Sequence, residues 1–296
     1  MHNRHQSKMN SSWYASDLDY FKSGSEFRIL SVHKNVINLV SDKYSRLLII
    51  AVEGPVKGPS TVGLAEKDFL CLDSLISETD CFRLEKDRLN ISGNSGTISV
   101  NIYFGEKISF NVADYAKTEP AISGESYLFY NAILKRWPSP SASAVLLDLT
   151  GGEDYFRNEL LVNYPHLVQS ILKPDEEEFL NRCRKIIGTG RGLTPTGDDL
   201  IHGTLVTFRY FRPSIEFENR TFEEMLNLCN NTTLHGRHMI DLALHGLTLQ
   251  PVIELLKVIA TVHQPGYNLN RLLDVGSSTG YDLAVAVLYS ASQIGT

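Results

Sequence analysis

The chain has 296 residues, of which 43% are hydrophobic and 21% are charged, and its formal net charge is −6. This length is ample for a hydrophobic core and exceeds that of most single domains, so we expect two domains. A negative net charge without any run of Lys or Arg argues against nucleic acid and against an anionic membrane surface as partners. A small anionic ligand remains compatible, because a pocket inside an acidic protein can be locally positive.

The cysteines and the apolar runs indicate where such a chain works. Four scattered cysteines contain no C-x-x-C pair, and the polar first residues lack the apolar core of a signal peptide. The longest apolar stretches, around Leu47–Val52 and Leu283–Tyr289, are far shorter than a membrane span. We therefore expect a cytoplasmic protein with four free, buried thiols.

Strand signals are confined to the first part of the chain. Residues 1–25 are polar with little periodicity, which predicts a poorly ordered leader. Strands are then predicted at 27–32, at 47–52, and in a hairpin that joins 89–91 to the alternating residues 98–102 through Asn94-Ser95-Gly96. We expect residues 26–115 to form a β-rich domain of the barrel or sandwich type.

Helical signals dominate the remainder. Acidic residues at 175–178, basic residues at 182–185 and Gly188 mark the start, the end and the stop of one helix. Further helices are predicted at about 125–137, 199–211, 221–229, 233–245, 250–263 and 281–292. Residues 116–296 are thus expected to form a mainly α-helical domain, which gives an α+β fold class.

One glycine-rich loop in the helical part has the composition of an anion-binding site. It reads Gly188-Thr189-Gly190-Arg191-Gly192-Leu193-Thr194-Pro195-Thr196-Gly197-Asp198-Asp199-Leu200. Closely spaced glycines let backbone N–H groups approach a ligand, and the N-terminus of the following helix favours an anion. Thr196 is predicted to be the N-cap, and Arg191 offers a bidentate contact. The loop has neither the lysine of a P-loop nor the spacing of a Rossmann fingerprint.

A second loop repeats this pattern 83 residues later. Gly276-Ser277-Ser278-Thr279-Gly280-Tyr281-Asp282-Leu283 aligns with the end of the first loop at Thr196, Gly197, Asp199 and Leu200, and both loops enter an apolar helix. Two helix N-termini facing one site would double the donors for a phosphate or carboxylate. The alternative is ordinary helix capping, since Ser/Thr followed three residues later by Asp is a common capping pattern. Asp199 and Asp282 are either capping residues or carboxylates that hold Mg²⁺ or orient a substrate amide. For a metal, capping is favoured, because hard-cation sites usually gather more oxygen ligands than two carboxylates.

The segment between the two loops offers additional ligand contacts. Thr232, Thr233 and Arg237 are candidates to line the same pocket. The histidines at 235, 238 and 245 allow a zinc site in principle, but no Glu or Cys completes one at a recognised spacing. A capped helix with surface or core histidines is the favoured interpretation, and we predict no metal site.

These motifs resemble those of a known family. The run Gly192-Leu193-Thr194-Pro195-Thr196-Gly197-Asp198-Asp199, followed by Gly203, resembles the G-L-T-P-S-G-D-D…G signature of the AllH family, with Thr196 in place of Ser. Thr232-Thr233 with Ala243-x-x-Gly246, and Ser278-Thr279-Gly280-x-Asp282, resemble its two later motifs in the same order. The β-rich first half also fits, so the resemblance extends over nearly the whole chain after the leader.

The resemblance implies a subunit of an oxamate carbamoyltransferase, which transfers a carbamoyl group between carbamoyl phosphate and oxamate. Partner subunits of such a complex are implied, and no cofactor is expected. The alternative is a non-catalytic subunit that binds a metabolite or serves assembly, while a kinase lacks support because no catalytic lysine or magnesium-binding set is visible. The expected catalytic residues are Arg191, Asp199 and Asp282. The expected substrate- or anion-binding residues are Gly190, Gly192, Thr194, Thr196, Gly197, Thr232, Thr233, Arg237, Ser278, Thr279 and Gly280.

Overall fold

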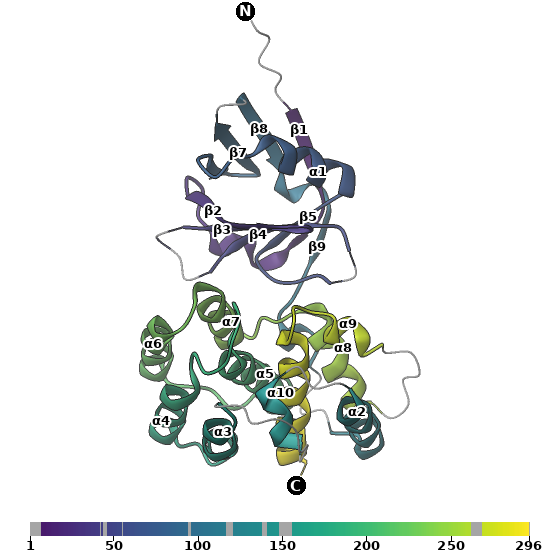
Figure 1. Ribbon diagram of the computed structural model, residues 1–296, viewed down its shortest axis with the longest axis vertical. Helices are drawn as coiled ribbons and strands as arrows, with labels where there is room; N and C mark the ends of the chain where they lie inside the picture. The colour runs from purple at the N-terminus through teal and green to yellow at the C-terminus, as the bar shows by residue number, and fades with distance from the viewer. Residues whose placement is uncertain are drawn as a thin grey trace, which may run out of the picture. The chain divides into compact units, whose positions relative to one another are not determined.

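A computed structural model describes residues 7–41, 43, 46–54, 56–93, 96–116, 121–137, 141–147, 156–261 and 268–295. Two compact units divide the chain, Met1–Phe110 and Asn111–Thr296. The division lies five residues before the boundary expected from the sequence, between 115 and 116. The first unit is β-rich and the second mainly helical, which confirms the predicted α+β class (Figure 1).

The β-rich unit is a barrel. Its strands are β1 (Ser7–Ala15), β2 (Glu26–His33), β3 (Val36–Val40), β4 (Leu48–Val52), β5 (Thr61–Leu64), β6 (Cys81–Glu85), β7 (Arg88–Gly93), β8 (Gly96–Asn101) and β9 (Glu106–Ile108). Among the described residues, eight strands close in the order β5-β4-β3-β2-β6-β7-β8-β1, because β1 pairs with β5, and β9 adds to β1. Among the described residues of this unit, one segment forms an α-helix, α1 (Glu66–Leu75). The predicted strands at 27–32 and 47–52 and the β7–β8 hairpin are confirmed, although Asn94 and Ser95 of its loop lie outside the described residues.

The predicted poorly ordered leader is wrong for Ser7–Ala15, which forms β1. Alternate side chains of this strand, from Met9 and Ser11 to Trp13 and Ala15, are buried in the barrel. Serine and alanine at two of these inward positions hide the alternation from a hydrophobicity pattern. The strand pairs with three others, so the barrel would be open without it.

A buried polar cluster fixes the segment that follows β1. Asp17, in the short 3-10 helix η1 (Ser16–Tyr20), accepts hydrogen bonds from the backbone N–H of Ser60 at 2.9 Å and from its hydroxyl at 2.8 Å. The Arg46 guanidinium lies 3.9 Å from the same carboxylate and 4.1 Å from the centre of the Tyr20 ring. Because buried charges are stable only when paired, this cluster ties the expected leader to the turn before β5.

The helical unit is organised around two long buried helices. Its helices are α2 (Gly124–Arg136), α3 (Arg157–Leu172), α4 (Glu176–Ile186), α5 (Thr196–Phe211), α6 (Asn219–Leu228), α7 (Leu234–Leu244), α8 (Gln250–Ile259), α9 (Asn270–Leu273) and α10 (Thr279–Ile294). Figure 1 shows α5 and α10 at the centre, with α3, α4, α6 and α7 on one side and α2, α8 and α9 on the other. Nearly every residue of α5 and α10 is buried, so these helices are the core of the unit.

The predicted helices of this unit are confirmed at α2, α4, α5, α6, α7, α8 and α10 with shifts at their ends. Helix α8 ends at Ile259, four residues before the predicted end, and residues 262 and 263 lie outside the described residues. Sequence reasoning missed α3, which contains Pro165 in its interior and carries apolar residues around much of its circumference. It also missed the four-residue α9, which is too short for a periodic signal.

Two further observations concern thiols and apolar helices. All four cysteines are free, as predicted, but Cys71 and Cys81 are exposed, so the expectation of burial is right only for Cys183 and Cys229. Cys71 lies on the solvent face of α1, and Cys81 points outward at the first position of β6.

No helix in the described ranges is both long enough and apolar enough to cross a bilayer.

Candidate functional site at the meeting of two loops

The two loops identified from the sequence meet in the helical unit. The Thr194 hydroxyl lies 2.6 Å from the Thr279 hydroxyl, so the loop before α5 and the start of α10 are joined by a hydrogen bond. The helices behind them are packed closely as well. A Cβ placed on Gly203 of α5 would lie 2.5 Å from the Cβ of Ala286 in α10, so the small residue at 203 permits this crossing.

The loops also share a backbone conformation, which makes the sequence match a structural repeat. Gly197 and Gly280 are each the second residue of a helix, and a Cβ there would lie 1.8 Å from the Ile186 carbonyl oxygen and 1.7 Å from the Leu272 carbonyl oxygen, respectively. The Gly197 N–H donates to the Thr189 carbonyl at 2.8 Å. The Gly280 N–H donates in the same way to the carbonyl of Val275 at 2.9 Å. Both glycine amides are therefore engaged inside their own loops.

A glycine with positive φ precedes the helix in each loop. Gly190 (φ 124°) packs against Thr196, and Gly276 (φ 63°) packs against Thr279, so each lies beside the first residue of the following helix. The segment from this glycine to the first residue of the helix is three residues longer in the first loop, where Arg191, Gly192 and Leu193 have no counterpart. These three residues are exposed. The first loop is thus the second loop with an exposed three-residue insertion that carries an arginine.

The capping interpretation of these loops is not supported. Helix α5 begins at Thr196 with Pro195 as its N-cap, and α10 begins at Thr279 with Ser278 as its N-cap. Neither N-cap residue makes a side-chain capping bond, so the prediction of Thr196 as N-cap is wrong. A proline with fixed φ starts α5 instead. The hydroxyls of Thr196 and Thr279, one on each helix, are consequently available for contacts across the junction.

Asp199 lies in the first turn of α5 and is completely buried. Burial raises its pKa well above the usual value, and the nearby carboxylates Asp282 and Asp198 raise it further, while the hydroxyls of Thr194 and Thr279 lower it. Neither carboxylate oxygen accepts a hydrogen bond of ordinary geometry from the residues that the structure describes. A buried carboxylate without donors costs free energy, which makes Asp199 the strongest candidate for contact with a ligand.

Asp282 occupies the equivalent position in α10 and is also completely buried. Burial raises its pKa to about 6, although the hydroxyls of Ser141, Ser143, Thr196 and Ser278 lower it. The Ser143 hydroxyl donates to Oδ1, whereas Oδ2 has no partner within the described part of the chain. Each carboxylate therefore has hydroxyls from its own loop and from the first residue of the opposite helix.

The third carboxylate, Asp198, has a structural role. Its Oδ1 accepts the Gly188 N–H at 2.8 Å, and its Oδ2 accepts the Thr232 hydroxyl. These bonds lower its pKa, but burial dominates and raises it to about 6. A Cβ on Gly236 would lie 2.0 Å from Oδ2, so this carboxylate is enclosed by the start of α7. Sequence reasoning treated Asp198 only as a first-turn acid and missed that it anchors the loop.

The expected residues between the loops have different outcomes. Thr233 caps α7 by accepting the Gly236 N–H at 2.9 Å and donates its hydroxyl to the Leu193 carbonyl, so it holds the first loop. Arg237 donates to the Asn230 side chain at 3.0 Å, a contact within its own segment. Arg191 is exposed, and no contact of its guanidinium with a described residue is recorded. The structure thus brings Thr232 and Thr233 into contact with the first loop, whereas a role for Arg237 there stays a prediction.

Sequence reasoning missed the serines that approach Asp282 from a third segment. Ser143 lies in the 3-10 helix η4 (Ala142–Leu147), and Ser141 immediately precedes it. The Ser141 hydroxyl also lies 3.0 Å from the Thr196 hydroxyl. The Ser- and Pro-rich composition around residue 140 reads as a linker, and only the tertiary fold shows that two of its serines reach the junction.

Metal ligands are not gathered in the described ranges. No group of three or more His, Cys, Asp and Glu side chains there is arranged to hold a metal ion. His245 of the predicted histidine set contacts the Asp241 carbonyl at 2.8 Å through Nδ1, which is a local contact at the end of α7. His202, which sequence reasoning did not consider, is buried between the Met239 carbonyl and the Thr248 hydroxyl, and burial lowers its pKa to about 4.

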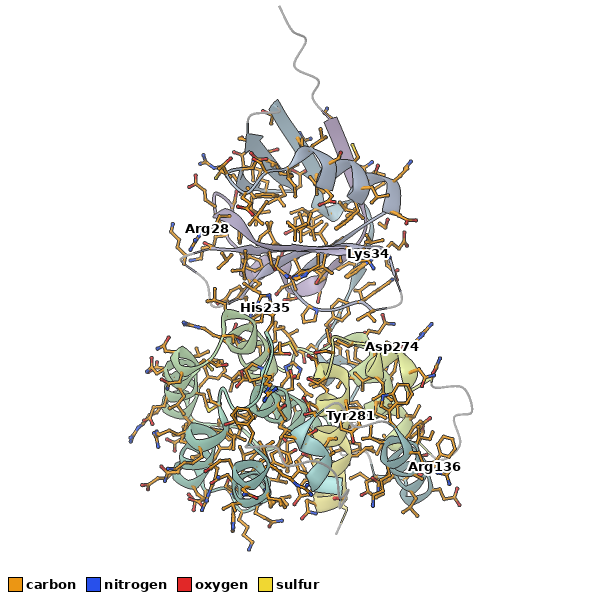
Figure 2. All side chains as sticks on the ribbon, viewed as in Figure 1. Arg28, Lys34, Arg136, His235, Asp274 and Tyr281 are labelled. Carbon is orange, nitrogen blue, oxygen red and sulfur yellow. The ribbon has the colours of Figure 1, made fainter. Side chains whose placement is uncertain are left out.

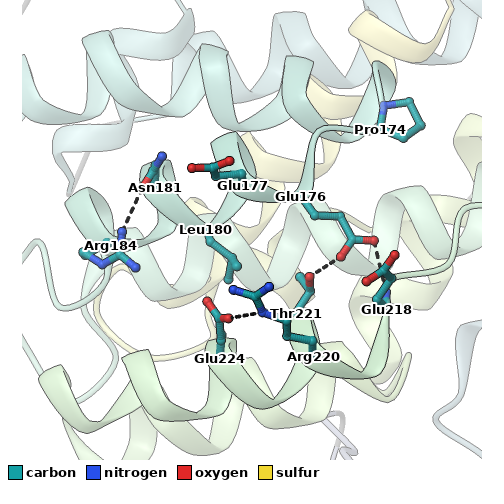
Figure 3. A pocket seen from close by; sticks show the side chains of 10 residues that line it. All are labelled: Pro174, Glu176, Glu177, Leu180, Asn181, Arg184, Glu218, Arg220, Thr221 and Glu224. Carbon is teal, nitrogen blue, oxygen red and sulfur yellow. Dashed lines mark hydrogen bonds and ion pairs between the residues drawn. The ribbon is translucent and has the colours of Figure 1, made fainter.

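A separate cavity of about 520 Å³ lies between α4 and α6 (Figure 3). Its polar groups are bonded to one another: Glu176 accepts the Thr221 hydroxyl and the Glu218 N–H, and Arg220 pairs with Glu224 at 2.7 Å. The bonds of Glu176 join the two helices, whereas the Arg220–Glu224 pair lies within α6. Among its described lining residues, the cavity offers no buried side-chain polar atom that lacks a partner, so it is a weaker candidate than the junction.

Comparison with known proteins yields one match. The model of the family described as oxamate carbamoyltransferase subunit AllH matches residues 186–291, about a third of the chain. Neither the curated proteins nor the solved structures contain a match. The matched segment starts at the end of α4 and includes both loops, α5, α7 and most of α10. The resemblance of this chain to the AllH family is therefore confirmed over the segment that builds the junction.

Proposed function

We propose that this chain is a subunit of a carbamoyltransferase and that its substrates bind at the loop junction, defined here as Thr194, Thr196, Asp199, Ser278, Thr279 and Asp282. The family match supports the first part, since the family is described as a subunit of oxamate carbamoyltransferase. The second part is supported because both halves of the junction lie within the matched residues. In this proposal, the protein works in a reducing cytoplasm together with partner subunits of the same complex.

The observation that carries the proposal is the pair of unsatisfied carboxylates. Asp199 and Asp282 are fully buried, yet three of their four oxygens accept no hydrogen bond of ordinary geometry from the described residues, although hydroxyls lie near them. Helices that merely needed caps would not require this arrangement, and neither loop uses its hydroxyls as a cap. A ligand that brings N–H groups to these oxygens would satisfy them.

The chemistry of carbamoyl transfer fits these groups. The amide nitrogen of oxamate attacks the carbamoyl carbon of carbamoyl phosphate, the new C–N bond forms, and the C–O bond to phosphate breaks. The nitrogen loses one proton, which passes to a carboxylate and from there to the departing phosphate. The products are oxalurate and inorganic phosphate, and the carboxylate is regenerated. Asp282 suits this role, because its pKa of about 6 leaves it mostly ionised at neutral pH and still basic enough to accept a proton.

Negative charge must be stabilised on the phosphate and on the carbonyl oxygen that is attacked. The helix N-termini contribute less than the sequence indicates, because the N–H groups of Gly197 and Gly280 are bonded within their loops. The donors that remain are the part-exposed hydroxyls of Thr194 and Thr279 and the exposed Arg191 with its flanking glycines. We assign anion binding chiefly to Arg191 and to these hydroxyls.

The test is an assay of phosphate release with the chain assembled with its partner subunits. We expect release from carbamoyl phosphate that depends on oxamate. Arg191→Ala should keep the melting temperature and weaken phosphate binding to the assembly at least tenfold in calorimetry, since the side chain is exposed. Arg184→Ala, an exposed arginine on α4, is the matched control and should bind phosphate normally.

Two outcomes would contradict the proposal. If Arg191→Ala and Arg184→Ala bind phosphate equally, the anion does not lie at the junction. If oxamate raises the melting temperature of the chain while the assembly turns nothing over, the chain is a metabolite-binding subunit without a catalytic part.

A further inference from the structure

The loop junction has an internal two-fold relationship that the family description does not mention. Asp199 in α5 and Asp282 in α10 are equivalent residues of two loops with the same glycine packing and the same amide bonds. Gly203 and Ala286, also equivalent positions, face each other where the two helices cross. The junction is therefore made of two similar halves related across the α5–α10 contact.

The exchange of hydroxyls between the halves follows the same relationship. The hydroxyl of Thr279, the first residue of α10, lowers the pKa of Asp199. The hydroxyl of Thr196, the first residue of α5, lowers the pKa of Asp282. Each carboxylate receives a second hydroxyl from its own loop, from Thr194 in one half and from Ser278 in the other. Each half thus presents a buried carboxylate, with at least one oxygen lacking a donor among the described residues, beside a hydroxyl from each loop.

This set of groups selects for a ligand that donates hydrogen bonds. The free oxygens of an ionised carboxylate are acceptors only. A primary amide carries two N–H donors on one nitrogen, together with a carbonyl oxygen to which a hydroxyl can donate. An anionic group would be repelled by the carboxylates themselves and must point toward the exposed loop residues. The geometry of each half therefore fits a molecule of the form H2N–C(=O)–X in which X is anionic.

Both substrates of the proposed reaction have this form. We propose that the junction contains two equivalent half-sites, each receiving the H2N–C(=O)– group of one substrate through its own aspartate. The inference rests on the proposed function, because that reaction supplies two such molecules. The half-site of Asp199 takes the carbamoyl phosphate, since the insertion with Arg191 adds positive charge to the first loop only. The half-site of Asp282 takes oxamate, so its carboxylate stands beside the nitrogen that loses a proton.

The Thr194 and Thr279 hydroxyls bond to each other beside the first half-site. These two hydroxyls are part-exposed and contact each other, whereas Asp199 beside them is fully buried. An entering amide would replace this bond, with its N–H group taking the place of a hydroxyl beside the carboxylate. The hydrogen bonds of the amide would compensate for the one that is lost.

The experiment compares Asp199→Asn and Asp282→Asn in the assembled enzyme. We expect Asp199→Asn to raise the KM for carbamoyl phosphate at least tenfold and to leave the KM for oxamate within twofold. We expect Asp282→Asn to raise the KM for oxamate at least tenfold, to leave the KM for carbamoyl phosphate within twofold, and to lower kcat. Asp274→Asn, at an exposed position after α9 (labelled in Figure 2), is the matched control and should leave all constants unchanged. Melting temperatures identify any variant that does not fold.

A second measurement keeps the inference testable if an aspartate variant misfolds. Oxalate has the shape of oxamate with a carboxylate oxygen in place of the NH2 group, so wild-type assembly should bind oxamate at least tenfold more tightly than oxalate. Equal affinity, or two aspartate variants that affect the same substrate, would overturn the two half-sites. If the wild-type assembly releases phosphate but gives either of these two refuting results, the proposed function still stands and only the half-sites are rejected. Absence of phosphate release by the wild-type assembly would contradict the proposed function itself.

Discussion

The junction depends on two glycines, Gly197 and Gly280, and the replacement Gly197→Ala should destabilise the helical unit. An alanine Cβ at 197 would lie 1.8 Å from the Ile186 carbonyl oxygen, whereas real contacts of this kind are almost never closer than 3.0 Å. The obstacle is backbone at the end of α4, so the start of α5 must move by more than 1 Å to relieve it.

The magnitude follows from two costs. Overpacking against a rigid neighbour costs about 1–3 kcal/mol. The displacement also breaks the 2.8 Å bond from the Gly197 N–H to Thr189, which contributes about 1 kcal/mol. The total, about 2–4 kcal/mol, corresponds to a fall in melting temperature of roughly 4–16 °C for a unit of this size.

The assay is thermal unfolding followed by circular dichroism at 222 nm. Gly124→Ala is the matched control, because Gly124 is in the first turn of α2, has no atom within 4 Å of a Cβ, and lacks a positive φ. We expect this control to melt at the wild-type temperature or slightly above it. A Gly197→Ala variant that melts within 1 °C of wild type would refute the close contact between α4 and α5.

Three further predictions address the junction and the barrel. A double-mutant cycle of Thr194→Val and Thr279→Val should give a coupling of about 0.5–1.5 kcal/mol in the free energy of unfolding, and a coupling below about 0.3 kcal/mol would show that the two hydroxyls are not bonded. Asp198 and Asp282 have folded-state pKa values near 6, above the 3.8 of the unfolded chain, so the folded state binds more protons and the free energy of unfolding should fall as pH rises from 4 to 6. The Asp282→Asn variant should show a smaller fall over this pH range in denaturant titrations. An unchanged pH dependence would contradict the assignment. Deletion of residues 1–15 removes β1 and its three pairings, so the β-rich unit should lose its cooperative unfolding transition, whereas a disordered leader would leave that transition in place.

Local patterns were sufficient for much of the fold. The amphipathic charge order of α4 and the apolar runs of α5 and α10 identify these helices directly, because the signals lie within one element. Strand β1 was missed because serine and alanine occupy two of its four inward positions. Closure of the barrel through the β1–β5 pairing joins segments about 50 residues apart, and no local pattern carries that information.

The candidate site was predictable in its residues but not in its chemistry. The match between Thr196-Gly197-x-Asp199 and Thr279-Gly280-x-Asp282 identified the two loops, and the structure brings them together. The sequence favoured backbone amides as the ligand-binding groups. The fold instead engages the amides of Gly197 and Gly280 inside the loops and leaves carboxylate oxygens without partners among the described residues. Such an outcome depends on which groups face each other across the junction, and only tertiary packing determines that.

The most direct measurement is a crystal structure of the assembled enzyme with oxamate. We predict density for oxamate at the junction, with its amide nitrogen within hydrogen-bond distance of Asp282 Oδ2 and its carboxylate turned toward the exposed loop residues. Oxamate bound elsewhere, in the cavity between α4 and α6 or on a partner subunit, with the two aspartates still enclosed, would contradict the assignment of substrate binding to these two loops.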